Sequence, residues 1–187
     1  STGARAKWFR NMEPDSNQII TYKEAMIPEK QPKSIVIIGA GAIGVEFAHF
    51  YQTFGTEVTL IEALSNILPI EDEDISTELE KIFKKRNMNI LTNTKVDKIE
   101  KLKTKVKVYL QGSDIVEAEQ ALISIGVQGN IEDLGLEECN VVVANGWIQK
   151  NEFMETSQNN VYAIGDVAGP PWLAHKASAE GIKIGRA

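Results

Sequence analysis

The stretch from Ser34 to Glu62 constrains the fold of this chain more than any other part of the sequence. It reads SIVIIGAGAIGVEFAHFYQTFGTEVTLIE, so an apolar run leads into Gly39, Gly41 and Gly44. A helix-like segment follows, and a second apolar run ends on an acidic residue. This order of strand, glycine-rich turn, helix and strand predicts a β-α-β unit with a dinucleotide-binding turn.

Each glycine of the turn has a physical role in such a unit. Gly39 permits the tight turn out of the strand, Gly41 lets the backbone approach a pyrophosphate, and Gly44 lets the helix pack closely on the strand. The N-terminus of the helix offers free N–H groups and positive dipole to the phosphates. The alternative is a glycine-rich turn in an ordinary α/β domain, which the strand before it and the helix after it disfavour.

Glu62 indicates which dinucleotide the unit prefers. It follows Gly39 by 23 residues, a place where an acidic side chain accepts hydrogen bonds from the adenosine ribose diol. The carboxylate would repel a 2′-phosphate, and Ala63 and Leu64 offer no arginine to hold one. The sequence therefore predicts NAD rather than NADP.

Composition excludes several other classes of function. The net charge of −6 argues against a nucleic-acid partner or an anionic membrane surface. No apolar run approaches the roughly 20 residues that a membrane span needs, and residues 1–10 hold no signal-peptide core. We therefore expect a cytoplasmic location, or the mitochondrial matrix if the source is eukaryotic. Cys139 is the one cysteine, so an intrachain disulfide and a thiolate zinc site are excluded. We expect its thiol to be buried and inert.

Two helices are predicted inside the first half of the chain. The first covers about residues 42–54, with an apolar face of Ile43, Phe47, Phe50 and Phe54. The second follows Pro69, and its expected buried stripe is Ile75, Leu79, Ile82 and Phe83. Acidic residues 71–74 and basic residues 84–86 complement the dipole of this second helix. Because the EF-hand spacing is absent, dipole capping explains the acidic cluster better than a calcium site does, and no metal site is expected.

The remaining strands change period along the chain. Residues 89–91 suggest a third parallel strand, whereas residues 105–110 alternate between polar and apolar, which is typical of an antiparallel strand. Residues 121–125 are again mainly apolar. The expected fold class is α/β, with a Rossmann-like parallel sheet and a three-stranded antiparallel β-meander. Asn145-Gly146 is a hairpin signal.

A second motif, VYAIGDVAGPPWLAHKASAEG, covers residues 161–181. Residues 161–164 predict a buried strand that delivers Asp166 at its carboxyl end, and a helix is expected at residues 174–181. An aspartate at that place can bond a ligand hydroxyl, and the helix start can face an anion or an electron-rich ring edge. The alternative is that Asp166 only caps a turn.

Together the two motifs resemble the pyridine-nucleotide-disulfide oxidoreductases. The segments STGARA, GAGAIGVEFA, GVQGNIEDLGLE and GPPWLAHKASAEG carry the resemblance, which covers essentially the whole chain. It implies an FAD/NAD(P)-binding fold, FAD and NAD as cofactors, and transfer of electrons from a dithiol through FAD to NAD. The branch that the chain resembles most oxidises dihydrolipoamide, as a homodimer, for 2-oxoacid dehydrogenase or glycine-cleavage complexes.

The resemblance also implies two sets of site residues. On the NAD side, the residues that would line the pyrophosphate and reach toward the nicotinamide are Gly39, Ala40, Gly41, Ala42, Ile43, Gly44, Val45 and Glu46. Glu46 would approach the carboxamide, unless it is simply an exposed helix acid. Glu62 would hold the ribose, the backbone of Val96 would meet the adenine, and Gly126 would lie beside the NAD. On the flavin side, the contacts would come from Thr2, Gly3, Asp166, Trp172, Leu173, Ala174 and His175. Asp166 would bond the ribitol, and no catalytic residue is expected in this chain.

The chain also departs from the family pattern. Val127-Gln128-Gly129 stands where many relatives place Arg-x-Pro, and the Cys-x-x-x-x-Cys pair, the first FAD glycine motif and the dimerisation domain are missing. We therefore expect a central piece that is inactive alone. Residues 1–30 would end the first FAD segment, residues 31–130 would form the NAD domain, and residues 131–187 would begin a central domain. The alternatives are another FAD/NAD disulfide reductase, an NADH oxidase or peroxidase, or a non-catalytic NAD-binding module.

Overall fold

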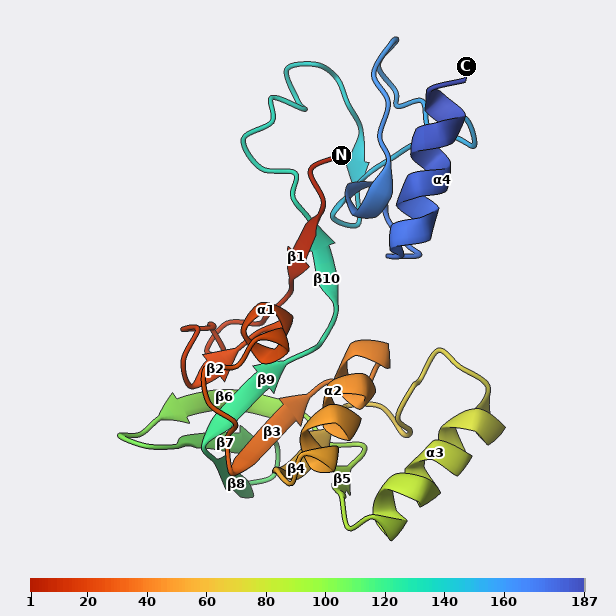
Figure 1. The fold of residues 1–187 in the computed structure, drawn as a ribbon. Helices are drawn as coiled ribbons and strands as arrows, with labels where there is room; N and C mark the ends of the chain where they lie inside the picture. Colours follow the sequence, from red (N-terminus) through yellow and green to blue (C-terminus); the bar gives the residue numbers. More distant parts are fainter. Residues whose placement is uncertain (187) are drawn as a thin grey trace. The chain divides into compact units, whose positions relative to one another are not determined.

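The structure, a computed structural model, describes residues 1–186 and divides the chain into two compact units (Figure 1). One is a continuous unit, Ala6–Gly126. The other is a discontinuous unit that joins Ser1–Arg5 to the chain from Val127 onward. The continuous unit closes on itself, because the backbone N–H of Lys7 donates to the carbonyl of Gly126 at 3.0 Å.

A five-stranded parallel sheet forms the centre of the continuous unit. Its order is β2 (Ile19–Ile20), β9 (Gln120–Ile123), β3 (Ser34–Ile38), β4 (Glu57–Ile61) and β5 (Asn89–Leu91). Every neighbouring pair in it is parallel. The chain leaves β3 toward β4 and β5, and only later returns to its other side as β9. The carboxyl ends of β3 and β9 therefore flank a topological switch point, where ligands bind in such sheets.

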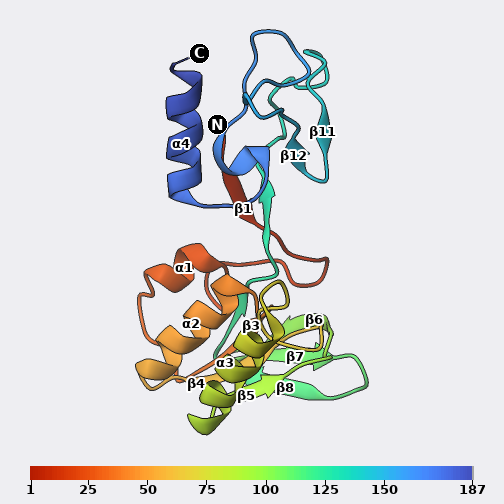
Figure 2. The ribbon, with the colours of Figure 1, turned by 90° about the vertical axis from the view of Figure 1, so that its right-hand side faces the viewer.

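Alternation along β3 builds a layer on each face of the sheet. Ile35 and Ile37 enter a core with helices α2 (Ala42–Thr53) and α3 (Glu73–Lys85) and with the short α1 (Tyr22–Met26). Val36 and Ile38 enter a second core with the antiparallel meander. That meander consists of β6 (Val96–Lys101), β7 (Val106–Leu110) and β8 (Ile115–Ala118). Figure 2 shows the helices and the meander on opposite faces. The predicted α/β fold with its parallel sheet and meander is confirmed.

The predicted apolar face of α2 is correct only in part, because Phe47 packs against the core while the phenylalanines that follow it do not. Phe50 and Phe54 are 41% and 62% exposed, whereas the buried residues are Gly44, Val45, Ala48 and Tyr51. Small residues at Gly44 and Ala48 allow the helix backbone to approach the sheet closely. Phe47 and Tyr51 pack beside these small residues, whereas Phe50 and Phe54 point away from the core.

The predicted stripe of α3 is correct only in part. Phe83 is buried and Leu79 packs against the core, but Ile75 and Ile82 are exposed. The expected electrostatics are present. Asp72 caps the helix by accepting from the backbone N–H of Asp74, and Lys84 and Lys85 lie in the last turn.

The discontinuous unit has a smaller core. Its four buried members are Val141, Ile148, Ala163 and Val167. Strand β1 (Ala4–Ala6) pairs with β10 (Val127–Gly129), and β11 (Val143–Ala144) pairs with β12 (Trp147–Ile148) in the hairpin predicted at Asn145-Gly146. A 3₁₀ helix, η1 (Gly165–Ala168), and α4 (Ala174–Ile184) complete the unit.

Two further expectations in this unit are wrong. Residues 161–164 form no strand, because they have only the isolated bridge between Tyr162 and Glu155, and Val161 is exposed. The apolar run has no neighbouring strand to pair with, so only Ala163 is buried. Cys139 is exposed rather than buried, since it lies in a turn and not beside a strand.

Among residues 1–186, no helix combines the length and the apolar character that crossing a membrane requires.

Candidate functional site

At two positions of the glycine turn after β3, the backbone geometry and the neighbouring atoms leave room only for glycine. Gly39 has φ +98°, and a Cβ there would lie 2.6 Å from the carbonyl oxygen of Ser124. A Cβ on Gly44 would lie 1.9 Å from the carbonyl oxygen of Gly39. Both glycines are therefore required by the packing of β3, α2 and the end of β9, before any ligand is considered.

Gly41 differs from its two neighbours in the motif. A Cβ added there would meet no heavy atom within 4 Å, and its φ of −71° suits any residue. The protein itself therefore leaves the space in front of this residue open. The packing of the protein does not require a glycine at this position. The missing side chain therefore fits a role in which a ligand approaches the backbone closely.

The N-terminus of α2 is free to meet an anion. Gly41 is its N-cap and supplies no side-chain hydrogen bond, and the first turn contains no acidic residue. The turn itself is fixed from outside, because the backbone N–H of Leu68 donates to the carbonyl of Ala40 at 2.7 Å. A rigid turn with uncapped N–H groups at a helix start is an anion-binding arrangement.

Glu62 lies beside this turn, at the carboxyl end of β4. It is only 8% exposed, and its Oε2 accepts from the backbone N–H of Ala40 at 2.8 Å. Its Oε1 accepts from the backbone N–H of Leu64 at 2.9 Å. A carboxylate offers about four acceptor positions, so both oxygens can still accept hydrogen bonds from a diol. The same side chain thus orders the turn and presents negative charge at the edge of the sheet.

Ser124 is a further residue that holds the turn, and the sequence motifs did not predict it. Its hydroxyl oxygen lies 2.9 Å from the carbonyl of Ile38 and 2.7 Å from that of Gly39, so its proton holds the entry to the turn. A polar residue directly after the apolar run of β9 was the available signal. Because parallel strands end at the same edge, such a residue had to lie near the turn.

The other residues expected on the NAD side make fewer contacts with the glycine turn. The loop before β6 is joined to Glu62, because the N–H of Thr94 donates to its carbonyl at 2.9 Å, and Val96 follows as the first residue of β6. Gly126 ends the continuous unit with φ +111°. Glu46 is an exposed residue of α2, so its environment fits both the ligand contact and the plain helix acid.

In the discontinuous unit, the first residues of the chain are fixed by a polar cluster. The Thr2 hydroxyl donates to the carbonyl of Asn130 at 2.7 Å, and Asn130 Nδ2 returns a bond to the carbonyl of Thr2 at 3.0 Å. Gly3 has φ +76°. Arg5 pairs with Glu132, and this hydrogen-bonded ion pair lowers the pKa of Glu132 to about 2.

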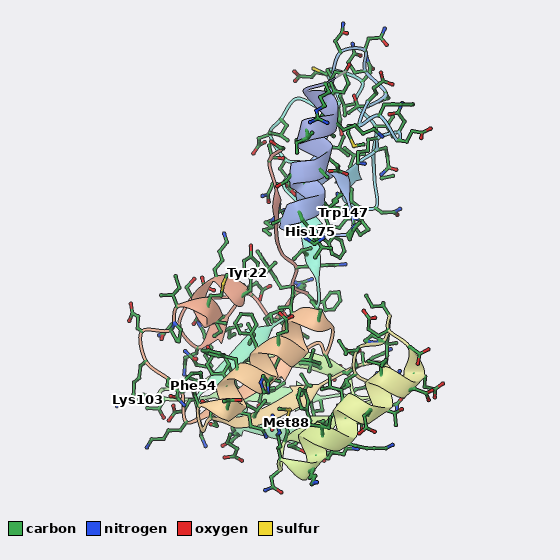
Figure 3. The ribbon with its side chains drawn as sticks, turned by 45° about the vertical axis from the view of Figure 1, so that its right-hand side comes forward. Tyr22, Phe54, Met88, Lys103, Trp147 and His175 are labelled. Atoms are coloured by element: carbon green, nitrogen blue, oxygen red, sulfur yellow. The ribbon has the colours of Figure 1, made fainter. Side chains whose placement is uncertain are left out.

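The second motif places its residues around η1 and the start of α4. Asp166 is half-buried on η1. The residues expected to face the isoalloxazine are exposed at the entry to α4, namely Trp172, Leu173, Ala174 and His175. The rings of Trp172 and Trp147 are 5.1 Å apart, and Figure 3 labels Trp147 and His175 on this unit. Helix α4 has neither a side-chain cap nor an acid in its first turn, so it too offers free N–H groups.

Comparison with known proteins places the chain among flavoprotein reductases. The profile described as pyridine nucleotide-disulphide oxidoreductase matches residues 1–181. Dihydrolipoyl dehydrogenase of Rhizobium etli is 42% identical over 97% of this chain and 39% of its own length. Dihydrolipoyl dehydrogenase of Bacillus subtilis is 42% identical over 97% of this chain and 40% of its own length. The chain thus spans about two fifths of the length of these relatives.

Solved structures give the same assignment. LpdA from Mycobacterium tuberculosis matches with a TM-score of 0.90 and 28% identity, over 97% of this chain and 40% of that one. The Cu(II) complex of the HOCl-induced flavoprotein disulfide reductase RclA from Escherichia coli matches with a TM-score of 0.88 and 25% identity, over 97% and 42%. The glycine turn, the acid at the end of β4, the sheet with its meander and these matches lead to one conclusion: the chain belongs to the pyridine nucleotide-disulphide oxidoreductase family.

Proposed function

We propose that the continuous unit is an NAD-binding domain. The observation that carries the proposal is the position of Glu62, which bonds the N–H of Ala40 while it lies at the ligand edge of the sheet. In this arrangement the uncapped start of α2 meets the pyrophosphate over the open position at Gly41. Glu62 accepts from the adenosine ribose hydroxyls and disfavours a 2′-phosphate. Val96, Gly126 and Glu46 complete the proposed NAD contacts.

We propose further that the discontinuous unit contributes to an FAD site. Members of the family use FAD and NAD, and FAD supplies the redox chemistry that joins a dithiol to NAD. The polar groups of this unit suit a flavin. Asp166 is a half-buried acceptor for ribitol hydroxyls, and the start of α4 offers N–H groups and positive dipole to the ring edge. Thr2 and Gly3 contribute backbone contacts.

For the whole protein, we propose oxidation of dihydrolipoamide, with electrons passed through FAD to NAD. The relatives named dihydrolipoyl dehydrogenase support this substrate. The proposal includes a homodimer that serves 2-oxoacid dehydrogenase or glycine-cleavage complexes, without nucleic-acid or membrane partners. It also includes a location in the cytoplasm, or in the mitochondrial matrix of a eukaryote. Cys139 is the chain's one cysteine, so residues 1–187 contain no redox-active pair, and we expect them to catalyse nothing alone.

A titration of the chain with NADH, and in parallel with NADPH, tests the NAD site by calorimetry. We expect saturable NADH binding and much weaker NADPH binding. Glu62→Gln removes the charge but keeps the shape of the side chain. It should weaken NADH binding about tenfold, the equivalent of one charge-assisted hydrogen bond, and narrow the preference over NADPH.

Glu57→Gln is the matched control, because Glu57 is exposed at the amino end of the same strand. It should bind NADH as the unaltered chain does. Equal or tighter binding of NADPH by the unaltered chain would refute the ribose argument.

A second candidate remains within the same class. The match to the RclA disulfide reductase supports another FAD/NAD disulfide reductase rather than a dihydrolipoamide enzyme. The two are separated by assaying NADH formation from dihydrolipoamide, using the protein expressed with any natural sequence that flanks residues 1–187. Turnover with dihydrolipoamide supports the first candidate. Flavin-bound protein that forms no NADH from dihydrolipoamide supports the second candidate.

A further inference from the structure

A buried group of three charged side chains lies in the discontinuous unit, outside the contacts assigned above. Glu180 on α4 is 8% exposed, and its Oε1 lies 3.0 Å from Lys150 Nζ and 3.5 Å from Lys176 Nζ. Its Oε2 accepts from the backbone N–H of Gly165 at 2.8 Å. The side chains of both lysines are also mostly buried. We call these three residues the α4 charge cluster.

The hydrogen bonds of the α4 charge cluster converge on η1. Lys176 Nζ donates to the carbonyl of Gly165 at 3.1 Å and to that of Gly169 at 2.8 Å. Gly165 begins η1, and Gly169 is the residue that follows its end. The ammonium of Lys176 and the carboxylate of Glu180 thus bind the start of η1 through both its carbonyl and its N–H, and the lysine also binds its far end.

Stability alone is a weak explanation for such a cluster. Burying charges is costly, and well-packed apolar residues in place of a buried ion pair are often neutral or stabilising. Unlike apolar packing, the hydrogen bonds of the cluster are directional. Each ammonium and carboxylate atom is committed to a particular backbone atom or partner, so the cluster fixes the orientation of η1 relative to α4.

That orientation matters because η1 and α4 carry the two parts of the proposed flavin site. Asp166 follows Gly165 directly, and His175 precedes Lys176 directly. A shift of η1 along α4 would change the spacing between the ribitol acceptor and the helix start that faces the ring. Binding sites lose affinity when their supporting contacts allow such misplacement.

We propose that Glu180, held by Lys150 and Lys176, is a positioning residue that sets Asp166 against the start of α4 for flavin binding. The inference rests on the proposed FAD site. It assigns to Glu180 no contact with the flavin itself.

The first test needs no flavin. Glu180→Gln and Lys150→Met should increase hydrogen exchange at the Gly165 amide, because the carboxylate that accepts its hydrogen bond is lost or released. Lys150→Arg retains the charge and should restore protection. Ile148→Val removes a buried methylene from the same small core without touching the cluster, so it controls for general loosening of the unit. Unchanged protection of Gly165 in Glu180→Gln would overturn the inference.

The second test measures FAD affinity by flavin fluorescence, in the protein expressed with any natural flanking sequence. Glu180→Gln should weaken FAD binding about tenfold, as for one charge-assisted hydrogen bond, and Ile148→Val should not. Asp166→Asn reports on the FAD site itself. If Asp166→Asn weakens FAD and Glu180→Gln does not, the positioning role is refuted and the FAD site stands. If Asp166→Asn has no effect, the proposed FAD site fails instead.

Discussion

Gly44 and Gly41 belong to one motif, yet the structure predicts opposite consequences for replacing them with alanine. A Cβ on Gly44 would lie 1.9 Å from the carbonyl oxygen of Gly39, and real contacts of this kind do not fall below 3.0 Å. Helix α2 would therefore have to move by about 1 Å or more from the end of β3. The obstacle is backbone, so no side-chain rotation relieves it. We expect Gly44→Ala to destabilise the continuous unit by about 3 kcal/mol, the upper end of ordinary overpacking.

Gly41→Ala should leave the fold intact. Its Cβ would enter open space at an ordinary φ, so the gain of about 0.4–1 kcal/mol through the unfolded chain offsets the cost of placing alanine at the N-cap of α2. The same methyl group would stand where the pyrophosphate is proposed to approach. We therefore expect NADH binding to be lost or strongly weakened without any loss of stability.

Urea titration combined with hydrogen exchange of the peptides that cover β3 and α2 measures the stability of the continuous unit for both variants. Calorimetry with NADH measures binding. The reasoning is refuted if Gly44→Ala unfolds at the same urea concentration as the unaltered chain. It is also refuted if Gly41→Ala, while folded, binds NADH with unchanged affinity.

Two further predictions concern Ser124, which binds the glycine turn, and the ion pair between Arg5 and Glu132. Ser124→Ala should destabilise the continuous unit by about 0.5–1.5 kcal/mol and weaken NADH binding, because the loop carbonyls near its hydroxyl lose their donor; urea titration and calorimetry measure both effects. Arg5 depresses the pKa of Glu132 from 4.5 to about 2, so this pair contributes stability above pH 4.5 that is lost as the pH falls toward 2. An NMR titration of the Glu132 carboxyl should show a midpoint near 2 that returns toward 4.5 in Arg5→Gln, and an unshifted midpoint in the unaltered chain would contradict the pairing.

The sequence predicted those parts of the molecule that depend on local chemistry. The spacing of Gly39, Gly41 and Gly44 between a strand and a helix has few structural solutions, and the period-2 pattern at residues 105–110 is specific to a half-buried strand. The hairpin at Asn145-Gly146 follows from its turn chemistry in the same way.

The parts that failed depend on contacts between distant segments. Helix α2 has two candidate apolar faces, and the close approach to β3, which Gly44 and Ala48 permit, selects the one that buries Val45 and Tyr51 and leaves Phe50 and Phe54 exposed. The run at residues 161–164 is apolar but lacks a partner strand, which no local pattern reveals. Ser124 holds a turn 85 positions away in the sequence, so its role becomes visible only when β3 and β9 are known to be neighbours.

The continuous unit interrupts the discontinuous one, and this has a consequence for synthesis on the ribosome. Strand β1 is made about 120 residues before its partner β10, which at 5–20 residues per second is a delay on the order of ten seconds. During that interval the inserted unit can fold, and its two ends, joined from Lys7 to Gly126, then bring β1 to the place where β10 emerges. The loop-closure entropy of a long flexible chain is thereby replaced by that of the short gap between Lys7 and Gly126. Nascent chains stalled at a length where Gly126 has left the ribosome but β10 has not should already protect β3 and β9 from exchange, while the amides of β1 remain open.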